Sequence, residues 1–110
     1  MVKPIATLQE FHEKINHDSD VVVIDFWATW CGPCKAISPI FERMEGQFPD
    51  LKFYKVDVDE AEEISQEVGV RAMPTFMVFT KGEKVKDLVG ANPGGLQDLL
   101  KWAAELAKKA

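Results

Sequence analysis

The only two cysteines of this 110-residue chain are separated by two residues, in the segment Trp30-Cys31-Gly32-Pro33-Cys34. If a helix begins at Cys34, then Cys31 lies one turn away at its N-terminus, and the two sulfurs can reach disulfide distance. Unpaired backbone N–H groups and the positive end of the helix dipole favour a thiolate at that place. The spacing therefore predicts dithiol chemistry, with Cys31 as the nucleophile and Cys34 as the resolving thiol that releases a reduced partner.

A carboxylate lies inside the apolar run that precedes the cysteines. Asp25 stands between Ile24 and Phe26, and burying a charge there costs free energy unless the fold compensates. Burial without a cation would raise the pKa of Asp25, so that it could take a proton from Cys34 and return it. The alternative is an aspartate at a strand end that is hydrogen-bonded to the following loop.

Strand-like and helix-like patterns alternate along the chain, which is typical of a small α/β domain. The predicted strands cover residues 21–27, 53–58, 75–80 and 84–89. The first two read as parallel strands of a buried sheet. The last two flank the loop 81–83 and read as an antiparallel hairpin.

Four helices are predicted from apolar residues at helical spacing and from capping signals. The first helix follows a capping box that starts at Thr7. This helix ends before a turn over residues 16–20. The second carries the cysteines. The third is short, with Asp59 as its N-cap and an end near Gly69, and the fourth follows Asn92 as N-cap.

Composition limits the fold and the function independently of these motifs. With 46% hydrophobic residues and no low-complexity segment, residues 1–110 are expected to form a single domain. The net charge of −5 argues against nucleic-acid binding. Because no secretory or membrane-spanning segment is visible, we expect a cytoplasmic protein without membrane contact. Two cysteines in a reducing compartment are expected to be catalytic or metal-binding rather than structural.

Zinc binding is the alternative use of the cysteines, because His12 and His17 add two ligands at formally suitable spacings. Residues five apart on a helix point about 140° away from each other, and a buried strand separates the histidines from the cysteines. We therefore expect no metal site. The chain also has no phosphate loop and no dinucleotide or flavin motif, so electrons must come from another protein rather than from a bound cofactor.

Beyond these patterns, the chain resembles the thioredoxin family over nearly its whole length. The matching residues keep their order and spacing: Asp25, Phe26-Trp27-Ala28-Thr29-Trp30-Cys31-Gly32-Pro33-Cys34-Lys35, Pro39, Lys55, Ala72-Met73-Pro74-Thr75-Phe76, Gly82 and Gly90. The resemblance implies the thioredoxin fold, in which helices flank both faces of a central mixed β-sheet. The segments at residues 73–75 and 90–93 look more like those of eukaryotic cytosolic members than of bacterial ones.

The resemblance also implies supporting roles around the cysteines. Asp25 resembles the family's buried aspartate, and Lys55 resembles the lysine near that carboxylate. Gly32, Pro33 and Trp27 are expected to support the active site. For Trp27, ordinary core packing remains an equally good interpretation.

A substrate-binding surface is implied in the same way. The family's proline is cis and packs against the cysteines, which leaves the backbone of the preceding residue free to pair with an extended substrate. An ordinary trans proline is the alternative. The residues expected to bind substrate are Trp30, Met73, Pro74, Thr75, Gly90 and Ala91, although turn geometry alone would also explain the glycine.

The resemblance implies a general protein-disulfide reductase that an NADPH-dependent thioredoxin reductase returns to its dithiol form. Gly32 and Pro33 carry no charge, which favours a reductant over an oxidant. The reference reduction potential for thioredoxins is about −270 mV, and we adopt this value as a family expectation. The expected partners are that reductase and disulfide-containing proteins, and the expected state is a monomer. The alternatives are an oxidase or isomerase domain of the same fold and a non-catalytic binding subunit.

Overall fold

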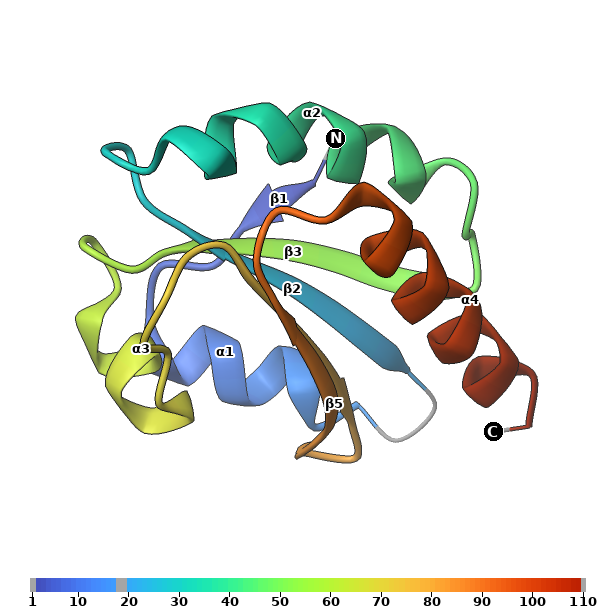
Figure 1. Cartoon of the computed structure of the whole chain (residues 1–110). Coiled ribbons are helices and arrows are strands. Elements are labelled where there is room, and N and C mark those ends of the chain that lie inside the picture. Colours follow the sequence, from blue (N-terminus) through green and yellow to red (C-terminus); the bar gives the residue numbers. More distant parts are fainter. Residues whose placement is uncertain (1, 18–19, 110) are drawn as a thin grey trace.

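The computed structural model describes residues 2–17 and 20–109, which form a five-stranded mixed sheet with helices on both faces (Figure 1). The elements in chain order are β1 (Lys3–Pro4), α1 (Leu8–Ile15), β2 (Val21–Trp27), α2 (Gly32–Glu45), β3 (Leu51–Asp57), α3 (Glu62–Val68), β4 (Thr75–Thr80), β5 (Glu83–Val89) and α4 (Pro93–Lys109). In space the strands follow the order β1-β3-β2-β4-β5. The first three run parallel, and the last two are antiparallel to their neighbours, which confirms the predicted mixed sheet.

Strands β2 and β4 have the predicted bounds, whereas β3 and β5 start earlier than predicted. β3 begins at Leu51 and ends at Asp57. β5 begins at Glu83, so only Lys81-Gly82 connect it to β4. β1 is absent from the predicted elements, because a two-residue segment that contains a proline carries no strand pattern of its own. It is a strand only through its parallel pairing with β3.

The predicted capping signals hold at α1 and α4. Thr7 Oγ1 accepts the Glu10 N–H at 3.1 Å, and Asn92 Oδ1 accepts the Gly95 N–H at 3.0 Å. Both bonds satisfy an N–H group that the first turn of a helix leaves without a partner. Part of the predicted turn over residues 16–20 lies outside the described residues, since the structure does not describe residues 18 and 19.

The predicted N-cap of α3 is wrong. Ala61, not Asp59, is the N-cap, and it makes no side-chain capping bond. The carboxylate of Asp59 instead accepts a hydrogen bond from Trp30 on another loop. The end of α3 is as predicted, because Gly69 adopts the left-handed conformation with φ 76°.

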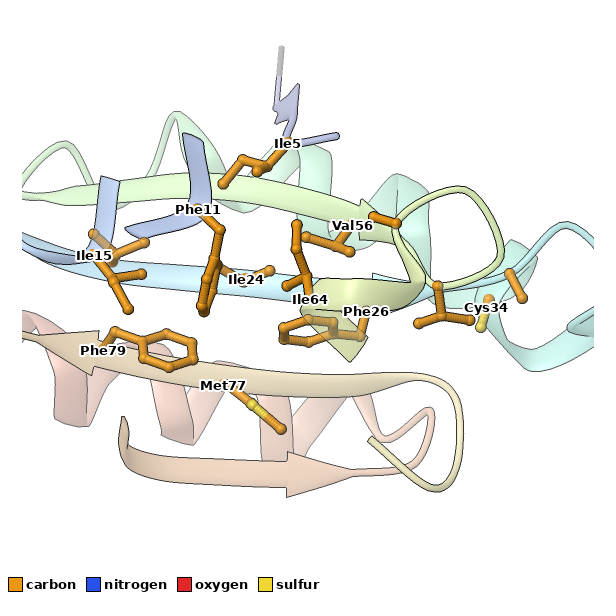
Figure 2. Packing of buried hydrophobic residues seen from close by; sticks show 14 of the residues in the cluster. Ile5, Phe11, Ile15, Ile24, Phe26, Cys34, Val56, Ile64, Met77 and Phe79 are labelled. Atoms are coloured by element: carbon orange, nitrogen blue, oxygen red, sulfur yellow. The ribbon is translucent and has the colours of Figure 1, made fainter. Parts of the chain in front are cut away.

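The core consists of two apolar layers, one on each face of the sheet. Even-numbered residues of β2 pack toward α1 and α3, and the odd-numbered Val21 and Val23 pack toward α2 and α4. Figure 2 shows Phe11 and Ile64 reaching into the first layer, where Phe11 meets Phe79 edge to face at 5.4 Å between ring centroids. Alternation along β2 therefore places Asp25 on the face that α2 covers.

Strand directions bring four loops to one edge of the sheet. β2 and β3 are parallel, so their carboxyl ends meet there. The start of β4 lies at the same edge because Thr75 pairs with Phe26, and the end of β5 lies there because Val89 pairs with Thr75. Within the described residues, no helix combines the length and apolar character needed to cross a membrane.

Candidate active site

The two cysteines lie at the start of α2, at this edge of the sheet. The helix begins at Gly32 rather than at Cys34, so Cys31 is the N-cap and Pro33 lies in the first turn. Cys31 Sγ accepts the backbone N–H of Cys34 at 3.1 Å. An N–H group at a helix N-terminus that points at a sulfur favours the thiolate form once the disulfide is reduced.

Cys31 and Cys34 form a disulfide, with 5.3 Å between their Cα atoms. The structure is therefore that of the oxidised protein. Cys31 is 4% exposed and Cys34 is 1% exposed, so both residues are buried in the oxidised protein. The roles of Cys31 as nucleophile and Cys34 as resolving thiol stay predictions.

Asp25 shares a pocket of about 350 Å³ with Cys34. Its side chain is 2% exposed, and Oδ1 has no hydrogen-bond partner among the described residues. Burial raises the pKa of Asp25 to about 7, against the opposing effects of the Lys55 ammonium and a hydrogen bond with Ser38, while Glu42 raises it further. A carboxyl with such a pKa can both accept and return a proton near neutral pH. Since Asp25 lies within β2, the alternative of a strand-end aspartate bonded to a loop receives no support.

Lys55 and Trp27 line the same pocket. Lys55 is the register partner of Asp25 on β3, and its Nζ lies 3.5 Å from Glu42 Oε2. Trp27 is half-buried and packs against the core layer of α1 and α3, so pocket lining and core packing are both part of its environment. Its indole N–H is buried without a hydrogen-bond partner among the described residues.

The sequence did not identify Ser38 and Glu42 as parts of the site. They follow Cys34 by four and eight residues, so they lie on the same face of α2, and all three line the pocket. This spacing is visible in the sequence. It gains meaning only when Asp25 and Lys55 are known to lie beneath that face of the helix.

Trp30 immediately precedes Cys31 and is exposed to solvent. Its side chain is 67% exposed, yet its Nε1 donates a hydrogen bond to Asp59 Oδ2 at 2.8 Å. Asp57 supports the same loop, because its carboxylate accepts the Asp59 N–H at 3.0 Å. The position of Asp59 just after β3 could have indicated its contact with Trp30. The end of β3 lies beside the end of β2, and Trp30 follows β2.

The segment before β4 lies at the same edge of the sheet as the cysteines. Met73 packs against the core layer that contains both sulfurs. The Met73–Pro74 peptide bond is cis, as the resemblance implies, so the interpretation as a trans proline is wrong. Thr75 is buried, and its Oγ1 donates a hydrogen bond to Ala72 O at 2.5 Å.

Gly90 joins this segment from the end of β5. Its N–H donates to Pro74 O at 2.9 Å, and its φ of 108° is one that side chains rarely adopt. A Cβ at Gly90 would meet no neighbouring atom within 4 Å, so the backbone conformation alone accounts for a glycine here. Ala91 follows and is exposed. The structure thus brings residues 73–75 and 90–91 together.

The histidines do not join the cysteines. His12 Nε2 lies 2.5 Å from Glu67 Oε2, which links α1 to α3. In the described part of the chain, no group of three or more histidine, cysteine or acidic side chains is arranged to hold a metal ion.

Comparison with known proteins agrees with this geometry. Residues 2–104 match the family model described as Thioredoxin. The chain is 51% identical to thioredoxin Asp f 29 of Aspergillus fumigatus over 102 residues, which cover 91% of this chain and 93% of that protein. It is 48% identical to thioredoxin-1 of Schizosaccharomyces pombe, with 92% of this chain and 97% of that protein covered.

A solved structure resembles the whole fold. The crystal structure of Malassezia sympodialis thioredoxin (Mala s 13) superposes with a TM-score of 0.89 at 48% identity and covers 94% of this chain and 93% of that chain. The similarity includes the mixed sheet, and the redox-active cysteine pair is present here. The chain belongs to the thioredoxin family of thiol–disulfide oxidoreductases, and its fold is the thioredoxin fold.

Proposed function

We propose that residues 1–110 act as a single domain that reduces disulfides in many different proteins. The Cys31 thiolate attacks one sulfur of a substrate disulfide, which forms a mixed disulfide and releases the other substrate sulfur as a thiolate. Cys34 then attacks Cys31 Sγ, which frees the second substrate thiolate and closes the Cys31–Cys34 disulfide. The substrate gains two electrons and the dithiol loses them. The observation that carries this proposal is that Cys34 shares its pocket with Asp25.

Asp25 is proposed to handle the proton of Cys34. As a carboxylate it would accept the proton from the Cys34 thiol and produce the thiolate that attacks the mixed disulfide. As a carboxylic acid it would return the proton when the disulfide is reduced again. Gly32, Pro33, Lys55 and Trp27 are proposed to support this site, the first two through the first turn of α2 and the last two as pocket walls.

Substrate is proposed to bind across the sheet edge around the disulfide. The exposed ring of Trp30 would cover one side of the reacting sulfurs. The backbone of Met73, Pro74 and Thr75 would pair with an extended substrate segment, a contact that tolerates many sequences. Gly90 and Ala91 would border this segment, since the Gly90 N–H is bonded to Pro74 O.

The dithiol is proposed to be restored by a thioredoxin reductase that draws electrons from NADPH. No cofactor bound by this chain is needed for that cycle, because the disulfide itself carries the electrons. We further propose that the protein works in the cytoplasm as a monomer, without nucleic-acid or membrane partners. The acidic net charge of −5 supports the absence of nucleic-acid partners.

The equilibrium potential of the Cys31/Cys34 pair tests the proposed direction of electron flow. The pair would be equilibrated with defined thiol buffers and followed by tryptophan fluorescence, because Trp30 is adjacent to Cys31. A potential near about −270 mV supports the reductase, and one near about −180 mV indicates oxidation or isomerisation instead. If the pair forms no reversible disulfide, both catalytic functions are excluded and the protein acts as a binding module.

Trapping tests the two cysteine roles. Cys34→Ser is expected to accumulate a mixed disulfide with a protein substrate, because the resolving thiol is missing. Cys31→Ser is the matched control and should form little of this adduct. Equal trapping by both variants, measured by mass spectrometry, would contradict the assignment.

A further inference from the structure

The ammonium group of Lys55 pairs with the carboxylate of Glu42 and not with that of Asp25. Lys55 and Asp25 are register partners on neighbouring strands. Even so, Lys55 Nζ lies 3.5 Å from Glu42 Oε2. Asp25 and Lys55 form no direct ion pair among the contacts of the described residues, and Asp25 Oδ1 has no hydrogen-bond partner there.

Glu42 is held in place from two sides. Its Oε1 accepts the backbone N–H of Val2 at 2.9 Å, and Val2 is buried just before β1. Its Oε2 faces Lys55, and the two side chains are 30% and 31% exposed respectively. A carboxylate fixed by a backbone N–H group can hold an ammonium at a defined place.

The pocket contains the charges that face Asp25. On α2, Glu42 lies on the same face as Cys34 and Ser38, and Lys35 adds a second positive charge to the pocket lining. On the sheet side, Lys55 comes from β3. Glu42 is therefore the negative side chain of the lining that competes with Asp25 for the Lys55 ammonium.

We propose that Glu42 is a positioning residue for the proton-transfer step. It holds the Lys55 ammonium away from Asp25, so that the buried carboxylate keeps the proton affinity that exchange with Cys34 requires. This inference rests on the proposed function, because it assumes that Asp25 exchanges a proton with Cys34.

The direction of the effect follows from the two interactions of Glu42. In Glu42→Gln the side-chain oxygen can still accept the Val2 N–H, but the negative charge is lost. Asp25 then loses a negative neighbour, and the released Lys55 ammonium can turn toward it. Both changes favour the carboxylate form of Asp25. Its titration midpoint should fall by about half a pH unit, the size expected for one partly screened charge.

The test is a carbon-13 NMR titration of the Asp25 carboxyl in the oxidised protein. Glu45→Gln is the matched control, because it removes the same charge from α2 at a position outside the pocket lining. We expect a lower midpoint in Glu42→Gln and an unchanged one in Glu45→Gln. An unchanged or higher midpoint in folded Glu42→Gln would overturn the proposal, with circular dichroism confirming the fold.

A double-variant cycle separates positioning from a simple charge effect. In a Lys55→Met background, Glu42→Gln should shift the Asp25 midpoint much less, because the ammonium that Glu42 holds is gone. An undiminished shift would overturn the positioning role.

The pH dependence of mixed-disulfide resolution distinguishes this proposal from the proposed function. The rate should rise with pH as Asp25 ionises, and the rise should occur at lower pH in Glu42→Gln. If the NMR midpoint moves and the rate profile does not, the proton-transfer role of Asp25 fails, while the position of Lys55 stands.

Discussion

Trp30 and Asp59 are joined by a 2.8 Å hydrogen bond from the indole Nε1 to the carboxylate Oδ2, across 29 positions of sequence. The bond links the loop that carries Cys31 to the loop that follows β3. Because the Trp30 side chain is 67% exposed, few packing contacts restrain the ring. This bond therefore sets the orientation of the large apolar surface beside the disulfide.

Removing the acceptor should weaken substrate binding. In Asp59→Ala the Trp30 ring loses its restraint, so KM for a protein disulfide should rise about threefold to tenfold with little change in kcat, as expected for one exposed charge-assisted bond. Asp59→Asn keeps an acceptor oxygen and should retain most of the affinity. Equal KM values for the two variants in steady-state assays would show that the hydrogen bond is not the cause.

The buried carboxylate should make stability depend on pH. The pKa of Asp25 rises from its ordinary 3.8 to about 7 on folding, mainly through burial. The folded state therefore binds this proton more tightly, and the resulting stability is present below pH 4 and lost as the pH rises through 7. Asp25→Asn should be more stable than the unsubstituted chain at pH 8 by on the order of 4 kcal/mol, with a much smaller difference at pH 4.

Denaturant unfolding of the oxidised protein at several pH values checks this prediction. The disulfide must stay closed in both proteins, so that Asp25 is the difference measured. A stability gain of equal size at pH 4 and pH 8 would show that burial of the charge is not responsible.

Gly82 should tolerate no side chain without a loss of stability. Its φ is 83°, and a Cβ would clash with Asn16 Oδ1. The Gly82 N–H also donates to Ile15 O at 2.8 Å, which ties the hairpin tip to the end of α1. Gly82→Ala is expected to cost about 1 to 3 kcal/mol in the free energy of unfolding.

A second glycine provides the control. Gly46 has φ −72°, and its added Cβ would be in ordinary contact with Arg43 O at 3.7 Å. Gly46→Ala should be neutral or stabilising by up to about 1 kcal/mol. If adding Asn16→Ala restores part of the stability that Gly82→Ala loses, the clash with Asn16 contributes to the loss. If it restores none, the whole loss comes from the backbone conformation.

The first helix depends on its N-cap. Thr7 Oγ1 accepts the Glu10 N–H at 3.1 Å, so Thr7→Ala should lower the free energy of unfolding by about 1 kcal/mol. Thr7→Ser keeps the hydroxyl and should behave almost like the unsubstituted chain. Thermal unfolding measures both, and a serine variant as unstable as the alanine variant would mean that the methyl group matters instead.

The elements of this fold could be predicted where short-range chemistry determines them. Runs of apolar residues identify β2 and β4, and side-chain caps identify the starts of α1 and α4. β1 could not be predicted, because its pairing with β3 is a contact between distant segments. Asp59 was assigned as a cap for a related reason: its local position fits one, but Trp30 binds its carboxylate.

The chemistry could be predicted from residue types and their spacing, because two cysteines at helix spacing and a carboxylate in an apolar strand indicate a dithiol and a buried acid. The charges that surround this acid depend on contacts between segments that are distant in the sequence. Glu42 and Lys55 belong to α2 and β3, and their pairing depends on the angle and distance at which the helix crosses the sheet. Electrostatic interactions change steeply with separation and burial, so the environment of Asp25 follows from packing rather than from any local pattern.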